Sequence, residues 1–167
     1  MNEATRPVDP TSTAAAASGE RFGDFYRREY ERAVRLAWLL CGSRAAAEDV
    51  VQDAMTAVYR SFERVESPAA YLRRAVINAA KSRQRDERRQ QERVTLLGRE
   101  RPLVDAADAE LFDLVGQLPY RQRVVIVGRY WGGWSEAEIA RALGCRPGTV
   151  KSLASRALNR LRQEVQQ

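Results

Sequence analysis

Residues 146–162 carry side chains that can hydrogen-bond to bases and phosphates. All charged residues in this segment are basic, and small polar residues lie between them. The cations are Arg146, Lys151, Arg156, Arg160 and Arg162, and the polar residues include Ser152, Ser155 and Asn159. Hydroxyl and amide groups can read base edges in the major groove of a duplex, while cations hold its phosphates. The pattern therefore favours nucleic-acid recognition, with a basic solvated helix at the end of an ordinary bundle as the alternative.

A helix-turn-helix would position these side chains. Ser135 and Glu138 have the spacing of a capping box, which starts a helix. Gly144 can adopt the left-handed conformation that ends a helix, and Pro147 suits the first position of the next one. The second helix has an apolar stripe on its other side, formed by Val150, Ala154, Ala157, Leu158 and Leu161. A helix, a glycine-containing turn and a second helix are the signature of this motif.

A second set of polar residues lies on a predicted helix over 44–62. Its apolar residues follow helical spacing throughout: Ala47, Val50, Val51, Ala54, Met55, Val58, Tyr59 and Phe62. The opposite face carries Glu48, Asp49, Gln52 and Asp53, an acidic patch on a chain whose formal net charge is +6. The pattern alone leaves two readings open, a partner-binding face or a solvated face, since acids also suit an early helical turn.

The next predicted helix, over 68–90, is strongly basic. Within 71–93 eight cations stand against three acids, so this segment holds most of the excess positive charge. Together with Tyr59, Phe62 and Tyr71 it is consistent with a surface that follows a phosphate backbone and meets unstacked bases. The alternative is that these rings belong to the core, and the helical register favours that alternative for Tyr71.

The composition excludes several classes of function. The 167-residue chain contains no histidine, which excludes Ser-His and Cys-His catalysis and histidine-ligated metals. Cys41 and Cys145 form no C-x-x-C pair, and no glycine-rich nucleotide-binding motif occurs. We therefore expect no catalytic residue, no metal site and no cofactor. The chain has no apolar run of membrane-spanning length and no signal pattern, so we expect no membrane insertion and a cytoplasmic location.

Periodicity divides the chain into two small all-α domains. The predicted helices cover 21–40, 44–62, 68–90, 108–118, 120–131, 135–143 and 147–162. The predicted boundaries are a disordered tail at 1–19, a first helical bundle at 20–92, a linker at 93–107 and a second domain with the helix-turn-helix at 108–167. Both domains end in a basic helix.

Two parts of the chain resemble conserved regions of the bacterial sigma-70 family. We find the likeness to the family's second region in AEDVVQDAMTAVYRSF and PAAYLRRAVINAAKSRQRDERR, and the likeness to its fourth region in LPYRQRVVIVGRYWGGWSEAEIARALGCRPGTVKSLASRALNRLR. Only these two regions are present, as in the extracytoplasmic-function group, and the match covers nearly all of 20–165. The resemblance implies a factor that binds core RNA polymerase, recognises the minus-thirty-five and minus-ten promoter elements and directs transcription initiation. It also implies regulation by an anti-sigma protein.

The resemblance assigns roles to individual residues. Docking on the polymerase falls to Ala47, Glu48, Asp49, Val51, Gln52 and Asp53. The loop that captures a flipped base of the minus-ten element, on melted non-template DNA, corresponds to Glu63, Arg64, Val65, Glu66 and Ser67. Asn78 and Lys81 match polar positions on the following helix, and charge extends this minus-ten set to Arg74, Arg83 and Arg85. The minus-thirty-five duplex would be read by Arg146, Thr149, Lys151, Ser152, Ser155 and Arg156.

Two positions depart from the family pattern, and rival functions stay open. The third helix often has a tryptophan where Tyr71 stands, and a tyrosine keeps the aromatic packing. Many relatives have arginine where this chain has Leu153, which either packs inward or touches a thymine methyl group. A stand-alone helix-turn-helix transcriptional regulator is the main alternative, but it would need neither the acidic helix nor the basic third helix. An enzyme would need nucleotide loops or histidines that are missing, and a membrane-surface protein would not explain the capped helix-turn-helix.

Overall fold

The computed structural model describes residues 10–91 and 106–165, and within them the side chains of 21–86 and 111–165. The described ranges form seven helices and no strand: α1 (Pro10–Cys41), α2 (Arg44–Ser61), α3 (Pro68–Gln91), α4 (Ala106–Gln117), α5 (Tyr120–Tyr130), α6 (Glu136–Leu143) and α7 (Pro147–Val165). The prediction of an all-α fold is confirmed. Most of the predicted linker, 93–107, lies outside the described residues, and its last two residues begin α4.

The start of α1 differs from the prediction. The helix begins at Pro10, whereas the sequence predicts a disordered tail through residue 19 and a helix from Arg21. Proline is favoured at the first helical position, where its missing N–H costs nothing, and the alanines of 14–17 are the strongest helix formers. Helix propensity therefore extends α1 into a stretch without an apolar face. Residues 1–9 of the predicted tail lie outside the described residues.

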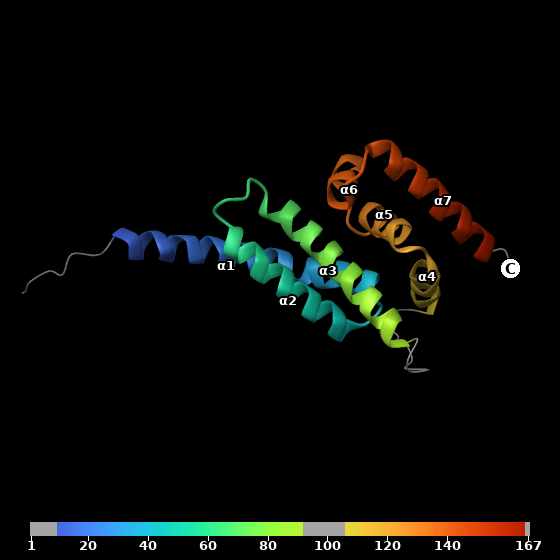
Figure 1. Cartoon of the computed structure of the whole chain (residues 1–167), viewed down its shortest axis with the longest axis horizontal. Coiled ribbons are helices and arrows are strands. Elements are labelled where there is room, and N and C mark those ends of the chain that lie inside the picture. Colours follow the sequence, from blue (N-terminus) through green and yellow to red (C-terminus); the bar gives the residue numbers. More distant parts are fainter. Residues whose placement is uncertain (1–9, 92–105, 166–167) are drawn as a thin grey trace, which may run out of the picture.

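Helices α1, α2 and α3 pack side by side into a bundle, which we call the first lobe (Figure 1). α2 begins after Ser43, whose hydroxyl accepts a hydrogen bond from the backbone N–H of Ala46 at 3.4 Å. The apolar stripe of α2 turns inward as predicted. Val51 is fully buried there, in one core with Leu40 of α1 and Val76 of α3.

Helices α4 to α7 form the second lobe, and the predicted caps are present in it. The Glu138 N–H donates to the Ser135 hydroxyl at 3.3 Å, and the Ser135 N–H donates to the Glu138 carboxylate at 2.9 Å. Gly144 ends α6 with a φ of 60°, in the left-handed region. Leu153 is 8% exposed and shares a buried cluster with Val125. Of the two possibilities for this leucine, the structure therefore shows inward packing.

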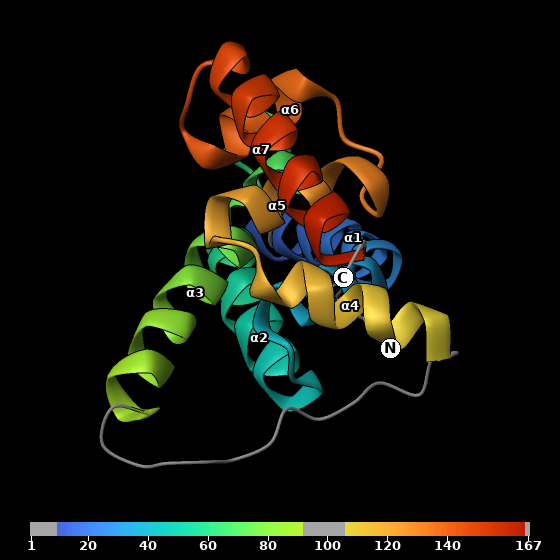
Figure 2. The ribbon, with the colours of Figure 1, turned by 90° about the vertical axis from the view of Figure 1, so that its right-hand side faces the viewer.

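The two lobes, whose relative placement the sequence leaves open, are packed against each other (Figure 1 and Figure 2). α5 contacts α1, and α6 contacts α3. One cluster of buried side chains runs through both lobes, from Phe25 of α1 to Ala157 of α7. Near the end of α1 the Trp38 ring stacks on Phe112 of α4, with ring centroids 4.5 Å apart. The helix-turn-helix is therefore seated on the first lobe.

Two side chains of α5 join the lobes by hydrogen bonds. Arg123 is 3% exposed and donates to the carbonyl oxygen of Leu40, near the end of α1, at 2.7 Å. The Tyr120 hydroxyl donates to the carbonyl oxygen of Ile77 in α3 at 2.6 Å. Burial raises the pKa of Tyr120 above its usual value, with a smaller effect from Cys41. The hydroxyl therefore stays protonated and remains a donor.

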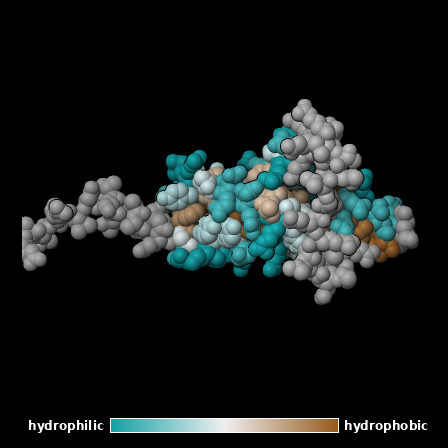
Figure 3. Space-filling model, turned by 90° about the horizontal axis from the view of Figure 1, so that it is seen from below, coloured by the Kyte–Doolittle hydropathy of each residue, from teal (hydrophilic) through white to brown (hydrophobic). Residues whose placement is uncertain are grey.

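The face seen from below is mostly hydrophilic, with hydrophobic side chains in small separate patches (Figure 3). The large apolar side chains that are exposed come from different parts of both lobes: Tyr59, Tyr71, Leu111, Tyr130, Trp131 and Val165. Among the helices that the structure describes, none combines the length and the apolar character needed to span a membrane.

Candidate nucleic-acid and protein interfaces

The acidic face of α2 is built by four polar residues, Glu48, Asp49, Gln52 and Asp53. The last three are exposed, and Glu48 is half-buried and pairs with Arg44 of the preceding turn at 2.9 Å. Ala47 and Val51, which the resemblance adds to the polymerase-binding set, are both 0% exposed and lie in the core of the first lobe. In this conformation these two can support the face from inside, while only the polar four can touch a partner.

An ion pair joins this acidic face to the basic helix α3. The Arg83 guanidinium lies 3.0 Å from the Asp49 carboxylate, and both side chains are partly exposed. The structure thus brings a predicted polymerase-binding residue against a predicted DNA-binding residue. The pair spans 34 positions of the chain, so no pattern within one helix could have revealed it.

The loop between α2 and α3 presents most of its predicted base-capturing residues to solvent. Glu63, Arg64, Glu66 and Ser67 are exposed, and Val65 is half-buried. The loop is ordered at both ends. The backbone N–H groups of Arg64 and Val65 donate to the Ser61 carbonyl oxygen, and the Ser67 hydroxyl accepts from the N–H of Ala70 to cap α3. The Glu63 carboxylate is bound by a residue that the sequence did not suggest, Arg21 of α1, at 2.9 and 3.0 Å.

The basic face of α3 forms one exposed stripe. Spacings of three or four residues place its members on the same side of the helix: Tyr71, Arg74, Asn78, Lys81 and Arg85. The prediction that Tyr71 is a core residue is wrong, because the ring is 38% exposed and the inward position beside it belongs to Leu72. Arg83 lies off this stripe and is half-buried. The structure therefore adds an aromatic side chain to the predicted minus-ten surface.

The predicted minus-thirty-five face of α7 is also exposed. Arg146, Lys151, Ser152, Ser155 and Arg156 are exposed, and Thr149 is half-buried. The Ser152 hydroxyl donates to the carbonyl oxygen of Gly148 at 3.1 Å, so its oxygen keeps lone pairs for an incoming donor. Lys151 approaches Glu136 of α6 at 3.9 Å. Lys151, Ser152, Ser155 and Arg156 lie on the exposed side of α7, away from its buried residues, as a groove-reading helix requires. Arg146 directly precedes the helix, and Thr149 lies at the edge of its buried side.

The start of α6 is tied to the first lobe by Arg73. Its guanidinium donates to the Glu138 carboxylate at 3.0 Å and lies over the Trp134 ring, 5.4 Å from the centroid. Glu138 also accepts from the N–H and hydroxyl of Ser135, and these hydrogen bonds lower the pKa of Glu138 below its ordinary value. The capping box and the contact between the lobes thus share one carboxylate.

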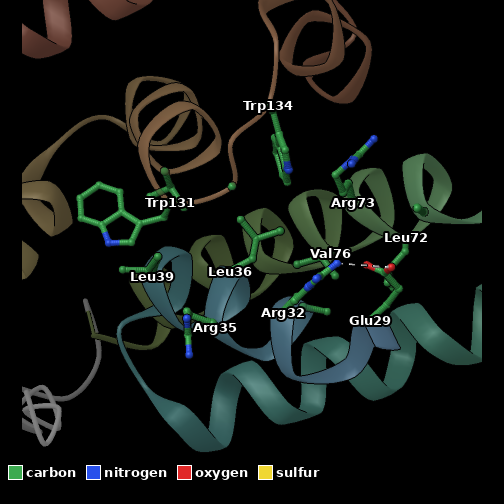
Figure 4. Close-up of a pocket in the computed structure, with 14 residues that line it drawn as sticks. Glu29, Arg32, Arg35, Leu36, Leu39, Leu72, Arg73, Val76, Trp131 and Trp134 are labelled. Carbon is green, nitrogen blue, oxygen red and sulfur yellow. Dashed lines mark ion pairs between the residues drawn. The ribbon is translucent and has the colours of Figure 1, made fainter. Parts of the chain in front are cut away.

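A cavity of about 340 Å³ lies where the lobes meet (Figure 4). The close-up shows Leu36, Leu39 and Val76 on its first-lobe wall, with Trp131 and Trp134 on the opposite side. Arginines also line it, Arg32 and Arg35 from α1 and Arg73 from α3. The lining is therefore mixed, because these apolar side chains lie beside the arginines and the Glu29 carboxylate. In the part of the chain that the structure describes, no cluster of acidic and cysteine side chains could hold a metal ion.

Comparison with known proteins identifies two conserved regions in the chain. Residues 25–90 match the region described as Sigma-70 region 2, and residues 108–161 match the one described as Sigma-70, region 4. The RNA polymerase sigma-E factor of Streptomyces coelicolor is 36% identical over 152 residues, which cover 86% of this chain and 85% of that protein. The ECF RNA polymerase sigma factor SigM of Mycobacterium tuberculosis is 34% identical over 162 residues, covering 92% and 82%.

Solved structures share the arrangement of helices. The sigma factor RpoE from Bartonella quintana, solved in complex with the anti-sigma factor NepR, superposes with a TM-score of 0.75 at 23% identity over 88% of this chain and 98% of that one. CnrH, solved in complex with the cytosolic domain of CnrY, superposes with a TM-score of 0.70 at 23% identity, covering 93% and 94%. At these identities the likeness shows a shared fold.

Proposed function

The chain belongs to the sigma-70 family of RNA polymerase sigma factors, in its extracytoplasmic-function group, and we propose how its surfaces perform that role. It binds core RNA polymerase, recognises the minus-thirty-five and minus-ten promoter elements and directs transcription initiation. One observation carries the proposal: a single chain presents an exposed acidic face and two basic faces, one basic face on each lobe. RNA synthesis belongs to the polymerase, so the chain acts by binding and not as an enzyme, in the cytoplasm.

The acidic face of α2 is the proposed contact with the polymerase. Glu48, Asp49, Gln52 and Asp53 offer carboxylate and amide groups that accept hydrogen bonds from a basic surface. An acidic face on a chain of net charge +6 is not needed for DNA binding, and it would repel a phosphate backbone. A protein partner with a basic surface would bind this acidic face.

The two basic faces are the proposed promoter readers. The loop 63–67 and the stripe on α3 offer hydrogen-bonding groups, cations and the exposed Tyr71 ring, which suit a melted strand with unstacked bases. The α7 face offers small polar groups between cations, which suit the major groove of a duplex. The first lobe therefore binds the melted non-template strand at the minus-ten element, and the second lobe binds the minus-thirty-five element as duplex.

Promoter binding by both faces requires the lobes to separate. Elements about 25 base pairs apart lie roughly 85 Å apart along B-DNA, at about 3.4 Å per base pair. The lobes are in contact, and α7 with its 19 residues is only about 28 Å long. Residues 92–105 between the lobes can reach about 50 Å when extended. We infer that the packed arrangement is the form of the free factor, and that binding to polymerase separates the lobes.

An anti-sigma protein is the proposed regulator, and the packed form is the state it would hold. Of the two structures that share the fold, RpoE was solved with the anti-sigma factor NepR, and CnrH was solved with the cytosolic domain of CnrY. The cavity between the lobes offers such a partner apolar side chains and three cations, Arg32, Arg35 and Arg73, beside one carboxylate, Glu29. A segment with apolar and acidic residues would complement it. By binding where the lobes meet, this partner would hold them together. The two promoter-reading faces could then not reach the minus-thirty-five and minus-ten elements at the same time.

The polymerase contact is tested by reversing charge on the acidic face. Asp49→Arg combined with Gln52→Ala removes the acceptors from the exposed centre of that face, and binding to core polymerase in a pull-down should fall at least tenfold. Glu31→Arg, an exposed charge reversal on α1 of the same lobe, is the matched control and should bind as wild type does. Both proteins should keep the wild-type helical circular dichroism.

The same experiment separates this function from its rival. A stand-alone helix-turn-helix regulator needs only the α7 face, and the wild-type chain would then fail to capture core polymerase while still binding duplex DNA. Unchanged polymerase capture by the folded double variant would show instead that the acidic face is merely solvated.

A further inference from the structure

The first described side chains of α1 lie against the loop that follows α2. The Arg21 guanidinium nitrogen Nη2 is 2.9 and 3.0 Å from the two carboxylate oxygens of Glu63. Arg21 and Glu63 are separated by 42 positions in the chain. The family match begins at residue 25, so Arg21 lies ahead of the region that defines the first lobe. Neither the motif nor the match gives this residue a role.

The residue after Arg21 reinforces the same contact. The Phe22 ring meets Phe62, the last residue before the loop, edge-on at 5.5 Å between centroids. It meets Tyr59, near the end of α2, at 4.9 Å, again edge-on. Such aromatic pairs add about 0.5–1.5 kcal/mol beyond the area that they bury. A charged contact and an aromatic contact from one turn of α1 thus converge on the start of the loop.

This arrangement changes the role expected of Glu63 in strand binding. A carboxylate beside a phosphate backbone would repel it, and a bound strand would be disfavoured. With Arg21 in place the carboxylate is neutralised and its oxygens are directed to α1. Glu63 is then suited to hold the loop and not to contact the strand. The adjacent Arg64 is exposed, and its guanidinium donates to the carbonyl oxygen of Arg60, one turn earlier, at 2.8 Å.

We propose that the segment Arg21–Phe22 is a positioning element for the base-capturing loop, with the Arg21–Glu63 ion pair as its specific contact. A loop that is already ordered loses less conformational entropy when it binds a strand, so anchoring strengthens binding without touching the DNA. Arg21 is a positioning residue in this scheme, because it acts on the strand through Glu63. The inference rests on the proposed minus-ten role of the loop.

The test uses holoenzyme reconstituted from the full chain and core polymerase, and a forked promoter oligonucleotide with a single-stranded minus-ten segment. Arg21→Ala and Glu63→Ala should each weaken binding about three- to fivefold, since an exposed ion pair is worth up to about 1 kcal/mol. The reversed pair, Arg21→Glu with Glu63→Arg, should bind within about twofold of wild type, although each reversal alone binds more weakly. Arg27→Ala, which removes another exposed arginine of α1 that pairs with Asp24, is the control and should bind as wild type does.

A second readout separates positioning from a general loss of structure. The difference in binding affinity between Arg21→Ala and wild type should vanish on a fork with abasic sites throughout its minus-ten segment, because no base then enters the loop. Binding to a minus-thirty-five duplex should not change. The melting temperature should fall by no more than about 4 °C, the shift expected for a loss of about 1 kcal/mol in a chain of this size.

Two results would overturn the inference while leaving the proposed function intact. Wild-type binding in Arg21→Ala would show that the pair does not order the loop. If the reversed pair bound the fork no more tightly than Arg21→Glu alone, the result would show that Arg21 itself contacts a phosphate. If wild-type holoenzyme failed to distinguish the intact fork from the abasic one, the proposed minus-ten role would fail and the inference with it.

Discussion

Replacing Arg123 with methionine is expected to destabilise the whole chain. The guanidinium is buried and donates to three carbonyl oxygens, those of Leu40, Gly116 and Leu118. These carbonyls lie at or just beyond the C-terminal ends of α1 and α4, where the last carbonyls of a helix have no partner within it. The positive charge also suits the negative end of each helix dipole. Methionine keeps most of the side-chain stem and removes every donor.

The expected loss follows from these contacts. A hydrogen bond from a charged donor contributes about 1.5–3 kcal/mol, so three contribute roughly 5–9 kcal/mol. Burying the guanidinium costs several kcal/mol, which the methionine variant does not incur. The net loss of unfolding free energy is then about 3 kcal/mol, a large share of the roughly 5–15 kcal/mol available to a typical protein. For a chain of this size it corresponds to a fall in melting temperature of about 6–12 °C.

Urea unfolding followed by far-UV circular dichroism measures this loss. Arg121→Met changes an exposed arginine on the same helix and should stay within about 0.5 kcal/mol of wild type. The reasoning is refuted if Arg123→Met also stays within that margin, because the helix-end carbonyls would then find equivalent partners without the guanidinium.

Two further predictions concern the helix-turn-helix. Leu153→Ala should cost about 2–5 kcal/mol in urea unfolding because the side chain is in the core, whereas a leucine that faced DNA would leave stability almost unchanged. The lowered pKa of Glu138 means that its contribution to stability is present above its unfolded pKa and is lost as pH falls through the lower folded pKa. The difference in unfolding free energy between wild type and Glu138→Gln should therefore shrink between about pH 7 and about pH 3, and a constant difference would show that the carboxylate is not the titrating group.

Local patterns predict the elements well, because the residues that start and end a helix act within a few positions. Ser135, Glu138 and Gly144 are enough to place α6, and the structure contains all the cap contacts that they imply. The exposed and buried sides of α2 and α7 follow in the same way from helical periodicity. The start of α1 differs from the prediction because alanines favour a helix without any packing, so the absence of an apolar face does not by itself indicate disorder.

Contacts between distant segments could not be predicted from the same patterns. The Arg73–Glu138 pair spans 65 positions and the Arg123–Leu40 contact spans 83, so neither leaves a periodic signal. The prediction for Tyr71 fails for a different reason, which is its position on the helix. Its register lies one position from the buried line of α3, and a large ring at such an edge can be partly exposed. Packing of the lobes, the exposure of Tyr71 and the anchor of the loop all depend on tertiary contacts.

Run-off transcription with purified core polymerase on a library of promoter templates tests the central claim most directly. We predict that the wild-type chain directs initiation from a defined subset of templates that share two elements at one spacing. Asp49→Arg with Gln52→Ala should abolish this selection, while Glu31→Arg should preserve it. If the folded wild-type chain selects no template above the background of core polymerase alone, the claim that its two lobes position the polymerase at promoters is contradicted.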